Sequence, residues 1–208
     1  MAAMAEDQHV LRKMFCEFDV LSCPDGSAMK YRNRSCLRPN KLIIDKACVE
    51  AVYRPKVGQP RVADKTKEKM IGNTCSSAIL STLYPRTSVS IILQEMQNSG
   101  GLMACAINAA YLALIRSGIA MKFLVAAVTC GITKDDKVIL DPDLNKVKDC
   151  HTELMFAFDS IDFNIVAVDS SGQYTEEQYQ KALSLCKEAS NEIFDFYRNL
   201  VKKYACCI

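Results

Sequence analysis

Two adjacent glycines, Gly100 and Gly101, stand directly before an apolar stretch with helical spacing. The N-terminus of a helix presents free backbone N–H groups and a partial positive charge, so a glycine-rich entry to a helix is typical of an anion site. The next two residues are Leu102 and Met103, which carry neither a cation nor a hydroxyl group. The sequence therefore predicts the backbone of an anion site without the side chains that would bind the anion.

Four carboxylates form a second candidate cluster: Asp141, Asp143, Asp149 and Glu153. Carboxylates this close in sequence can hold a magnesium ion or act as a general acid. They also fit an ordinary polar loop after a strand, which is the interpretation we favour from these residues alone. A lone histidine beside them, His151, is expected to be a surface or packing residue. Phosphate-loop, nucleophile-elbow, zinc-protease and dinucleotide motifs are absent from the sequence.

Eleven cysteines are scattered along the chain. Metal sites need paired ligands at short spacing, and there is no C-x-x-C pair and only two histidines to complete such a set. The odd count also argues against a complete set of disulfides. We expect reduced thiols, most of them in apolar surroundings, with no metal and no other cofactor.

The net charge of +2 hides an uneven distribution. Residues 30–69 carry twelve Lys or Arg and only four Asp or Glu. A basic segment of this kind suits a polyanionic partner, because neutralised phosphates release their counterions. A solvated, lysine-rich loop and helix face explains the same pattern equally well. Charge alone leaves both interpretations open.

The first half of the chain alternates predicted strands with one helix. Strands are predicted by β-branched and alternating residues over 14–21, 46–53 and 86–97, and a turn by Pro24, Asp25 and Gly26. Apolar residues at helical spacing predict a helix over 63–83.

The second half begins with a helix over 102–116 that is small and apolar nearly all round, and such a helix is buried. Two strand pairs follow, one over 123–132 and 137–141 and the other over 153–159 and 164–172. A long amphipathic helix over 175–204 ends the chain, with Thr175 as its N-cap. This order predicts one mixed α/β (α+β) domain over 1–208, with terminal tails at 1–12 and 205–208. No apolar run reaches the roughly 18 residues of a membrane helix, so no membrane partner is expected.

Several segments together resemble the RNase PH family, in the same order along nearly the whole chain. They are CPDGSA (23–28), residues 53–75, residues 83–122, ILDPD (139–143) and residues 193–204. The resemblance implies a fold like domain 2 of ribosomal protein S5 and assembly into a hexameric ring around an RNA channel. Among family members, the sequence is most similar to eukaryotic exosome ring subunits. That implies RNase PH-like subunits, S1- or KH-type cap subunits and RNA as partners, and a location in the nucleus, nucleolus and cytoplasm.

The residues that carry phosphorolysis in this family are altered. A Thr-Arg pair that grips phosphate corresponds here to Leu102 and Met103, and the catalytic aspartate pair corresponds to Val147 and Glu153. Arginines usual in the preceding helix correspond to Asn73 and Ser76. Leucine and methionine offer no donor to phosphate, and valine carries neither a proton nor a metal. We therefore expect no catalytic residues and no phosphorolysis.

The segment over residues 29–45 is shortened. It lacks the family's Gly-Asp-Thr motif and is too short for a core strand and its turn, which take on the order of ten residues. Loss of that strand would remove hydrogen-bonding partners from its neighbours. Arg32, Arg34 and Arg38 lie in this segment, so they are left out of the charge argument.

The remaining cations form a basic run from loop into helix, in a region that borders the RNA path in related ring subunits. Its members are Arg54, Lys56, Arg61, Lys65, Lys67 and Lys69. A solvated helix face is the alternative to RNA contact. The leading hypothesis is a non-catalytic exosome ring subunit that supports 3′-to-5′ RNA processing, including ribosomal RNA maturation. The alternatives are a homodimeric metal-dependent or phosphorolytic nuclease, and a shortened form that does not assemble.

Overall fold

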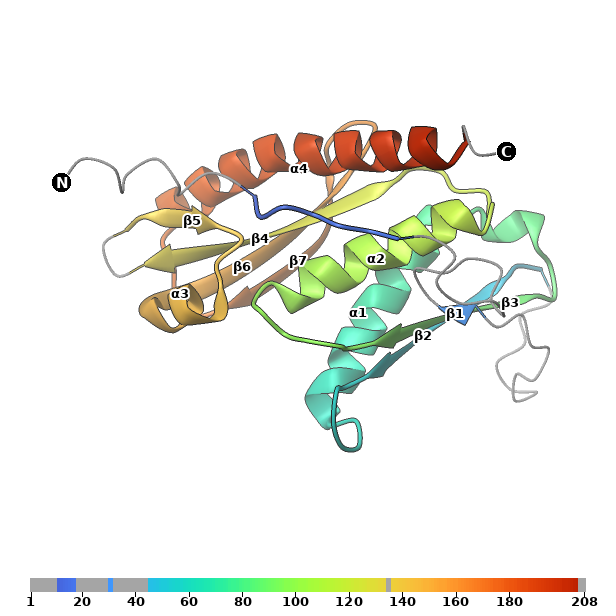
Figure 1. Ribbon diagram of the computed structural model, residues 1–208, viewed down its shortest axis with the longest axis horizontal. Helices are drawn as coiled ribbons and strands as arrows, with labels where there is room; N and C mark the ends of the chain where they lie inside the picture. The colour runs from blue at the N-terminus through green and yellow to red at the C-terminus, as the bar shows by residue number, and fades with distance from the viewer. Residues whose placement is uncertain (1–10, 18–29, 32–44, 134–135, 206–208) are drawn as a thin grey trace. The chain divides into compact units, whose positions relative to one another are not determined.

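The computed structural model describes residues 11–17, 30–31, 45–133 and 136–205 of the 208-residue chain (Figure 1). The chain divides into two compact units, neither of them continuous in sequence. The C-terminal unit comprises Met1–Phe15, Asn98–Cys105 and Val125–Ile208, and the N-terminal unit comprises Cys16–Gln97 and Ala106–Leu124. Each unit is described by itself. The expectation of one domain over 1–208 stays a prediction.

A four-stranded antiparallel sheet forms the C-terminal unit, with strand order β5-β4-β6-β7. The strands are β4 (Val125–Thr133), β5 (Val138–Leu140), β6 (Cys150–Asp159) and β7 (Ile165–Ser171). Both predicted strand pairs are therefore confirmed. Every residue of β4 except the last is buried, because β4 lies inside the sheet and both of its faces are covered.

Helix α4 (Glu176–Ala205) packs along one face of this sheet (Figure 1). Its inner face repeats at three- and four-residue spacing, with Ala182, Cys186, Ala189, Ile193 and Tyr197 buried. Tyr179 meets Phe156 of β6 edge to face, with ring centroids 5.3 Å apart. The predicted cap is confirmed, because Thr175 Oγ1 accepts from the Gln178 N–H while Gln178 Oε1 accepts from the Thr175 N–H.

The N-terminal unit holds a second sheet of order β1-β3-β2, from β1 (Lys30–Tyr31), β2 (Cys48–Arg54) and β3 (Ser88–Gln94). Strands β2 and β3 are parallel, so helix α1 (Val62–Ala78) makes the crossover between them. A short 3-10 helix, η3 (Ser81–Leu83), follows α1. Gly72 of α1 faces β2, and a Cβ there would make an ordinary van der Waals contact with Ala51 Cβ at 3.7 Å.

Three sequence expectations are corrected. The strand predicted over 14–21 is absent from its described part, since residues 14–17 adopt no regular structure. The helix predicted over 63–83 ends at Ala78, where Ile79 turns extended and pairs with Met121 as an isolated bridge. The polar loop predicted after residue 141 contains a short helix, α3 (Leu144–Asp149), which was too short to show helical periodicity in the sequence.

The mixed α/β fold itself is confirmed, and helix α2 (Leu102–Arg116) has the predicted bounds. The turn predicted around Pro24 and most of the shortened segment over 29–45 lie outside the described residues. Within the described part of the chain, β2 pairs only with β3. No helix among these residues is long and apolar enough to cross a membrane.

Candidate functional site

The Gly-Gly turn has the backbone geometry that the sequence predicts. Gly100 and Gly101 have φ values of 96° and 61°, in the left-handed region that favours glycine. A Cβ on Gly100 would collide with the Pro142 carbonyl oxygen, and one on Gly101 would lie 3.0 Å from Asp141 Oδ1. Both glycines are therefore required by the close approach of residues 141–142, whether or not an anion ever binds.

A cation does lie at this turn, but it comes from residue 12. The Arg12 guanidinium donates through Nε and NH2 to both carboxylate oxygens of Asp141, and through NH1 to Asp143 Oδ1 at 2.8 Å. The remaining donors reach the carbonyl oxygens of Ser99 (2.9 Å) and Gly100 (3.2 Å). A guanidinium has five N–H donors, and these contacts occupy all five.

This saturation has a chemical consequence. Arg12 holds its charge firmly, because hydrogen bonding to Asp141 raises the pKa of the guanidinium. With every donor engaged and two carboxylates beside it, Arg12 has nothing to offer an external phosphate. Leu102 and Met103 are half-buried on the first turn of α2 and add no polar group. This arrangement is an internal ion-pair cluster that anchors the N-terminal segment, and no pattern in the sequence indicates it.

The Arg12 cluster also changes two sequence expectations. Residue 12 was assigned to a terminal tail over 1–12, and instead it is held by contacts to residues about 90 to 130 positions away. Asp141 and Asp143 bind a guanidinium, and the part of the chain that the structure describes contains no group of three His, Cys, Asp or Glu placed to hold a metal ion. Asp141 and Asp143 therefore act as partners of Arg12 in this structure.

The other degenerate positions lie on α3 and β6 of the same unit. Val147 is half-buried on α3, and Asp149 ends that helix with an exposed side chain. Glu153 is half-buried on β6, and burial, with a smaller effect from Asp169, raises the pKa of its carboxyl. His151 is exposed, as expected. A raised pKa is common to general acids and to carboxylates that are merely buried, so Glu153 alone defines no reaction.

The described cysteines are all free, as predicted: Cys16, Cys48, Cys75, Cys105, Cys130, Cys150 and Cys186. Burial raises the pKa of the Cys75 thiol to about 12, so the thiol stays protonated and unreactive.

One buried polar atom lies near the Gly-Gly turn. Thr129 Oγ1, close to Gly101, is the only buried side-chain polar atom in the described residues without a hydrogen-bonding partner.

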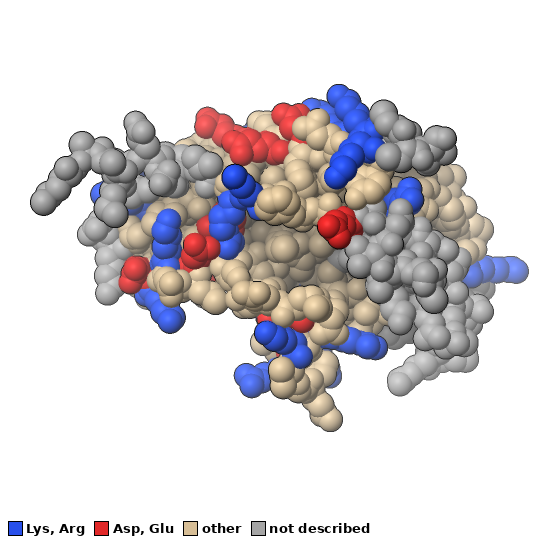
Figure 2. All heavy atoms as spheres, viewed as in Figure 1, with Lys and Arg blue, Asp and Glu red and all other residues tan. Residues whose placement is uncertain are grey.

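The predicted basic run lies in the N-terminal unit, on the loop after β2 and on α1. Arg61, Lys65 and Lys69 are exposed and recur at four-residue spacing, so they form one stripe along α1. Arg54 and Lys56 are exposed on the strand end and loop that lead into it. Figure 2 shows Lys and Arg side chains over the first turns of α1.

Lys67 differs from its neighbours. Its Nζ lies 3.4 Å from Asp64 Oδ1 and 5.2 Å from the centroid of the Tyr53 ring, and the side chain is 31% exposed. These contacts use Lys67 inside the unit, which leaves it less available to a partner than Lys65 or Lys69. Asn73 and Ser76, the positions that the family resemblance pairs with arginines, are exposed further along α1.

Removing Arg12 should destabilise the fold. Arg12→Ala leaves Asp141 without its bidentate partner, and we expect the free energy of unfolding to fall by about 1–2 kcal/mol in urea denaturation. Arg12→Lys should recover little of this, because an ammonium cannot make the forked contact. The matched control is Lys13→Ala at an exposed position, with an expected change within about 0.5 kcal/mol. Equal effects of Arg12→Ala and Lys13→Ala would contradict the ion-pair cluster.

Glu153 should weaken the fold at neutral pH. Because its pKa is raised by burial, the charged form is disfavoured in the folded state, and the penalty is present above the folded pKa and relieved as the pH falls. Glu153→Gln should therefore stabilise the protein at pH 7, and this gain should vanish below the ordinary pKa of glutamate. Urea denaturation of both proteins across this range measures the difference. The matched control is Glu188→Gln, at an exposed position on α4, and equal changes in the two variants would contradict an effect of burial at Glu153.

Comparison with known proteins gives the family. Residues 42–120 match the model of domain 1 of the 3′ exoribonuclease (RNase PH) family, and residues 124–189 match the model of its domain 2. The residues before 42, which include most of the segment predicted to be shortened (29–45), lie outside both matches.

Individual relatives agree with this assignment. The chain is 30% identical over 177 residues to a rice (Oryza sativa subsp. japonica) protein named exosome complex exonuclease RRP46 homolog, covering 77% of this chain and 74% of the relative. It is 28% identical over 206 residues to the exosome complex component RRP46 homolog of Caenorhabditis elegans, covering 93% and 95%. The crystal structure of rice Rrp46 superimposes with a TM-score of 0.86 at 28% identity, covering 95% of this chain and 98% of that one. The fold, the two consecutive domain matches and these relatives together establish that the chain belongs to the 3′ exoribonuclease family of RNase PH proteins.

Proposed function

We propose that this chain is a non-catalytic subunit of an RNA exosome core ring that supports 3′-to-5′ RNA processing and degradation, including ribosomal RNA maturation. The observation that carries the proposal is the Gly-Gly turn. Its one guanidinium, from Arg12, has all five donors engaged within the chain, and the first helical residues, Leu102 and Met103, are apolar. Relatives named as exosome components support the ring assignment.

The proposed loss of catalysis follows from the lack of free charged groups at the Gly-Gly turn. Phosphorolysis needs inorganic phosphate held as an anion beside a group that can transfer a proton. At the Gly-Gly turn, the described residues offer a saturated guanidinium and two hydrocarbon side chains, and one of the two aspartate positions is Val147. Leaving a phosphate dianion without charged partners costs several kcal/mol. The remaining carboxylate, Glu153, cannot replace a pair.

A phosphorolysis assay tests this directly. The purified chain is incubated with an oligoadenylate and radiolabelled inorganic phosphate, and an active RNase PH enzyme serves as positive control. We expect no phosphate-dependent release of nucleoside diphosphate. Release by the wild-type chain that disappears in the Glu153→Gln variant would overturn the non-catalytic proposal.

The second part of the proposal concerns RNA. The exposed cations on the β2–α1 loop and along α1 supply unspecific positive charge, which suits contacts to a phosphate backbone without base reading. Asp64 does not neutralise the stripe, because its carboxylate accepts from the Arg61 backbone N–H and lies beside Lys67. Arg61, Lys65 and Lys69 therefore remain available to phosphates.

Neutralising the stripe should weaken RNA binding. For Arg61→Ala/Lys65→Ala/Lys69→Ala, we expect weaker binding to single-stranded RNA and a salt dependence of log K that is shallower by about 2, since each lost phosphate contact removes about 0.7. Lys67→Ala should have a smaller effect than Lys65→Ala. The control is Lys146→Ala/Lys148→Ala/Lys181→Ala, which removes the same exposed charge from the C-terminal unit. Equal losses of RNA affinity in the two triple variants would mean that only net charge matters. That result would contradict RNA contact by the stripe on α1.

The partners follow from the ring role. We propose that the chain assembles with other RNase PH-like subunits in a heterohexameric ring that also binds S1- or KH-type cap subunits, in the nucleus, nucleolus and cytoplasm. Outside the ring, a homodimer is the state we propose for the isolated chain. The alternative of a homodimeric metal-dependent nuclease has less support, because Asp141 is committed to Arg12 and no three potential ligands cluster among the described residues.

A further inference from the structure

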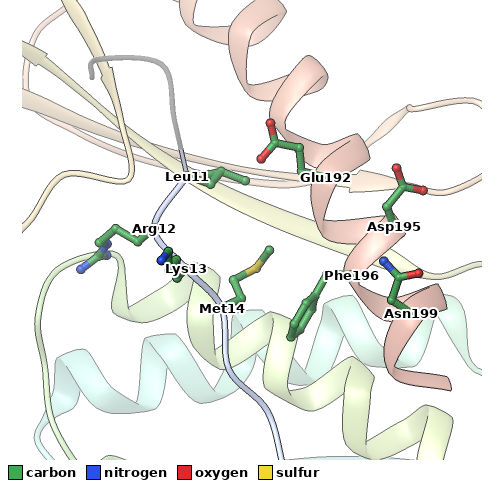
Figure 3. A pocket seen from close by; sticks show the side chains of 8 residues that line it. All are labelled: Leu11, Arg12, Lys13, Met14, Glu192, Asp195, Phe196 and Asn199. Atoms are coloured by element: carbon green, nitrogen blue, oxygen red, sulfur yellow. The ribbon is translucent and has the colours of Figure 1, made fainter. Parts of the chain in front are cut away.

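A groove runs between the N-terminal segment and the outward side of α4, wholly within the C-terminal unit (Figure 3). It has a volume of about 390 Å³. One wall is formed by residues 11–14, and the other by four residues of α4: Glu192, Asp195, Phe196 and Asn199. Arg12 is the only lining residue that also contacts the Gly-Gly turn, and no lining residue belongs to the basic stripe on α1. The surface of the groove is therefore not used by the function proposed above.

The wall formed by the N-terminal segment is fixed in place. Arg12 points away from α4 in Figure 3, toward its contacts with Asp141, Asp143 and the carbonyl oxygens of residues 99 and 100. Leu11 and Met14 project on the other side, toward α4. Because the anchor residue lies between them, both apolar side chains are presented by an ordered backbone. A ligand would therefore pay little entropy to order this wall.

The floor of the groove is apolar. Met14 and Phe196 are half-buried and line the groove from opposite walls. Exposed aromatic and methionine side chains at a concave surface are typical of the centre of a protein interface.

The rim on the α4 side is acidic. Glu188, Glu192 and Asp195 recur at four- and three-residue spacing, so they share one exposed face of the helix. Asp195 is paired with Arg198 at 2.8 Å, whereas Glu192 forms no ion pair with any residue that the structure describes. Figure 2 shows acidic side chains gathered over α4. An occupant with a cation beside an apolar group could pack the apolar group on the floor of the groove and place the cation at the acidic rim.

We propose that this groove docks an extended peptide segment of a partner protein, carrying a leucine- or phenylalanine-sized side chain next to a Lys or Arg. The apolar side chain packs between Met14 and Phe196, and the cation reaches Glu192. The limited volume accepts a side chain or two, and not a folded domain. The inference does not depend on the ring assignment, since it uses only the groove and its rim.

The test uses the full chain and a labelled peptide, Gly-Ser-Gly-Lys-Leu-Phe-Lys-Gly-Ser-Gly, in fluorescence anisotropy. We expect saturable binding that weakens about tenfold in Glu192→Lys, on the acidic rim, and in Met14→Ala, on the apolar wall. The matched control is Glu177→Lys, on the same helix but outside the groove, which should bind like the wild type. A peptide with Glu in place of both Lys should bind Glu192→Lys more tightly than it binds the wild type.

Three outcomes would overturn the proposal. They are the absence of saturable binding to the wild type, equal losses in Glu192→Lys and Glu177→Lys, and a charge-reversed peptide that does not recover binding. The other possible occupant of the groove is a second copy of this chain, and sedimentation of the free chain at several concentrations tests for it. A concentration-dependent dimer that is lost in Met14→Ala would assign the groove to a second copy of this chain and would also overturn the peptide proposal.

Discussion

The Arg12 guanidinium is the interaction on which the C-terminal unit depends. It joins the N-terminal segment, the entry to α2 and the loop between β5 and α3 through one side chain with all five donors engaged. Breaking any of these contacts would leave a partly buried charge without its partner, which costs more than the contact itself contributes. The same saturation leaves Arg12 without a free donor for an external phosphate. One set of contacts therefore anchors the N-terminal segment and underlies the proposal that the chain is non-catalytic.

The retained glycines fit this view. Gly100 and Gly101 have left-handed backbone conformations and no space for a Cβ beside Pro142 and Asp141. The two glycines are therefore explained by the tight packing of the turn, and their presence is not evidence that a phosphate binds there. A family of enzymes can lose its ligand-binding side chains while the backbone around them stays fixed by sterics. In this chain, exposed positive charge lies elsewhere, on α1 of the N-terminal unit, where it needs no precise geometry.

Local patterns predicted the long elements well. The buried helix over 102–116, both strand pairs and α4 with its Thr175 cap follow from periodicity, β-branched runs and capping chemistry, which act over a few residues. The short helix α3 and the end of α1 at Ala78 depend on tertiary contacts, so they were missed. Arg12 could not be assigned, because it is 129 residues from Asp141 and no local pattern marks an arginine as an anchor. The interpretation of Leu102 and Met103 as replacements for phosphate-binding residues depends on the family resemblance, because no local pattern shows which residues stand there in other members.

The most direct measurement is native mass spectrometry of the complex purified through a tag on this chain from its own cells. The account predicts one copy of this chain with equimolar RNase PH-like subunits and RNA-binding cap subunits. Recovery of the chain alone, or with chaperones only, would contradict the ring assignment.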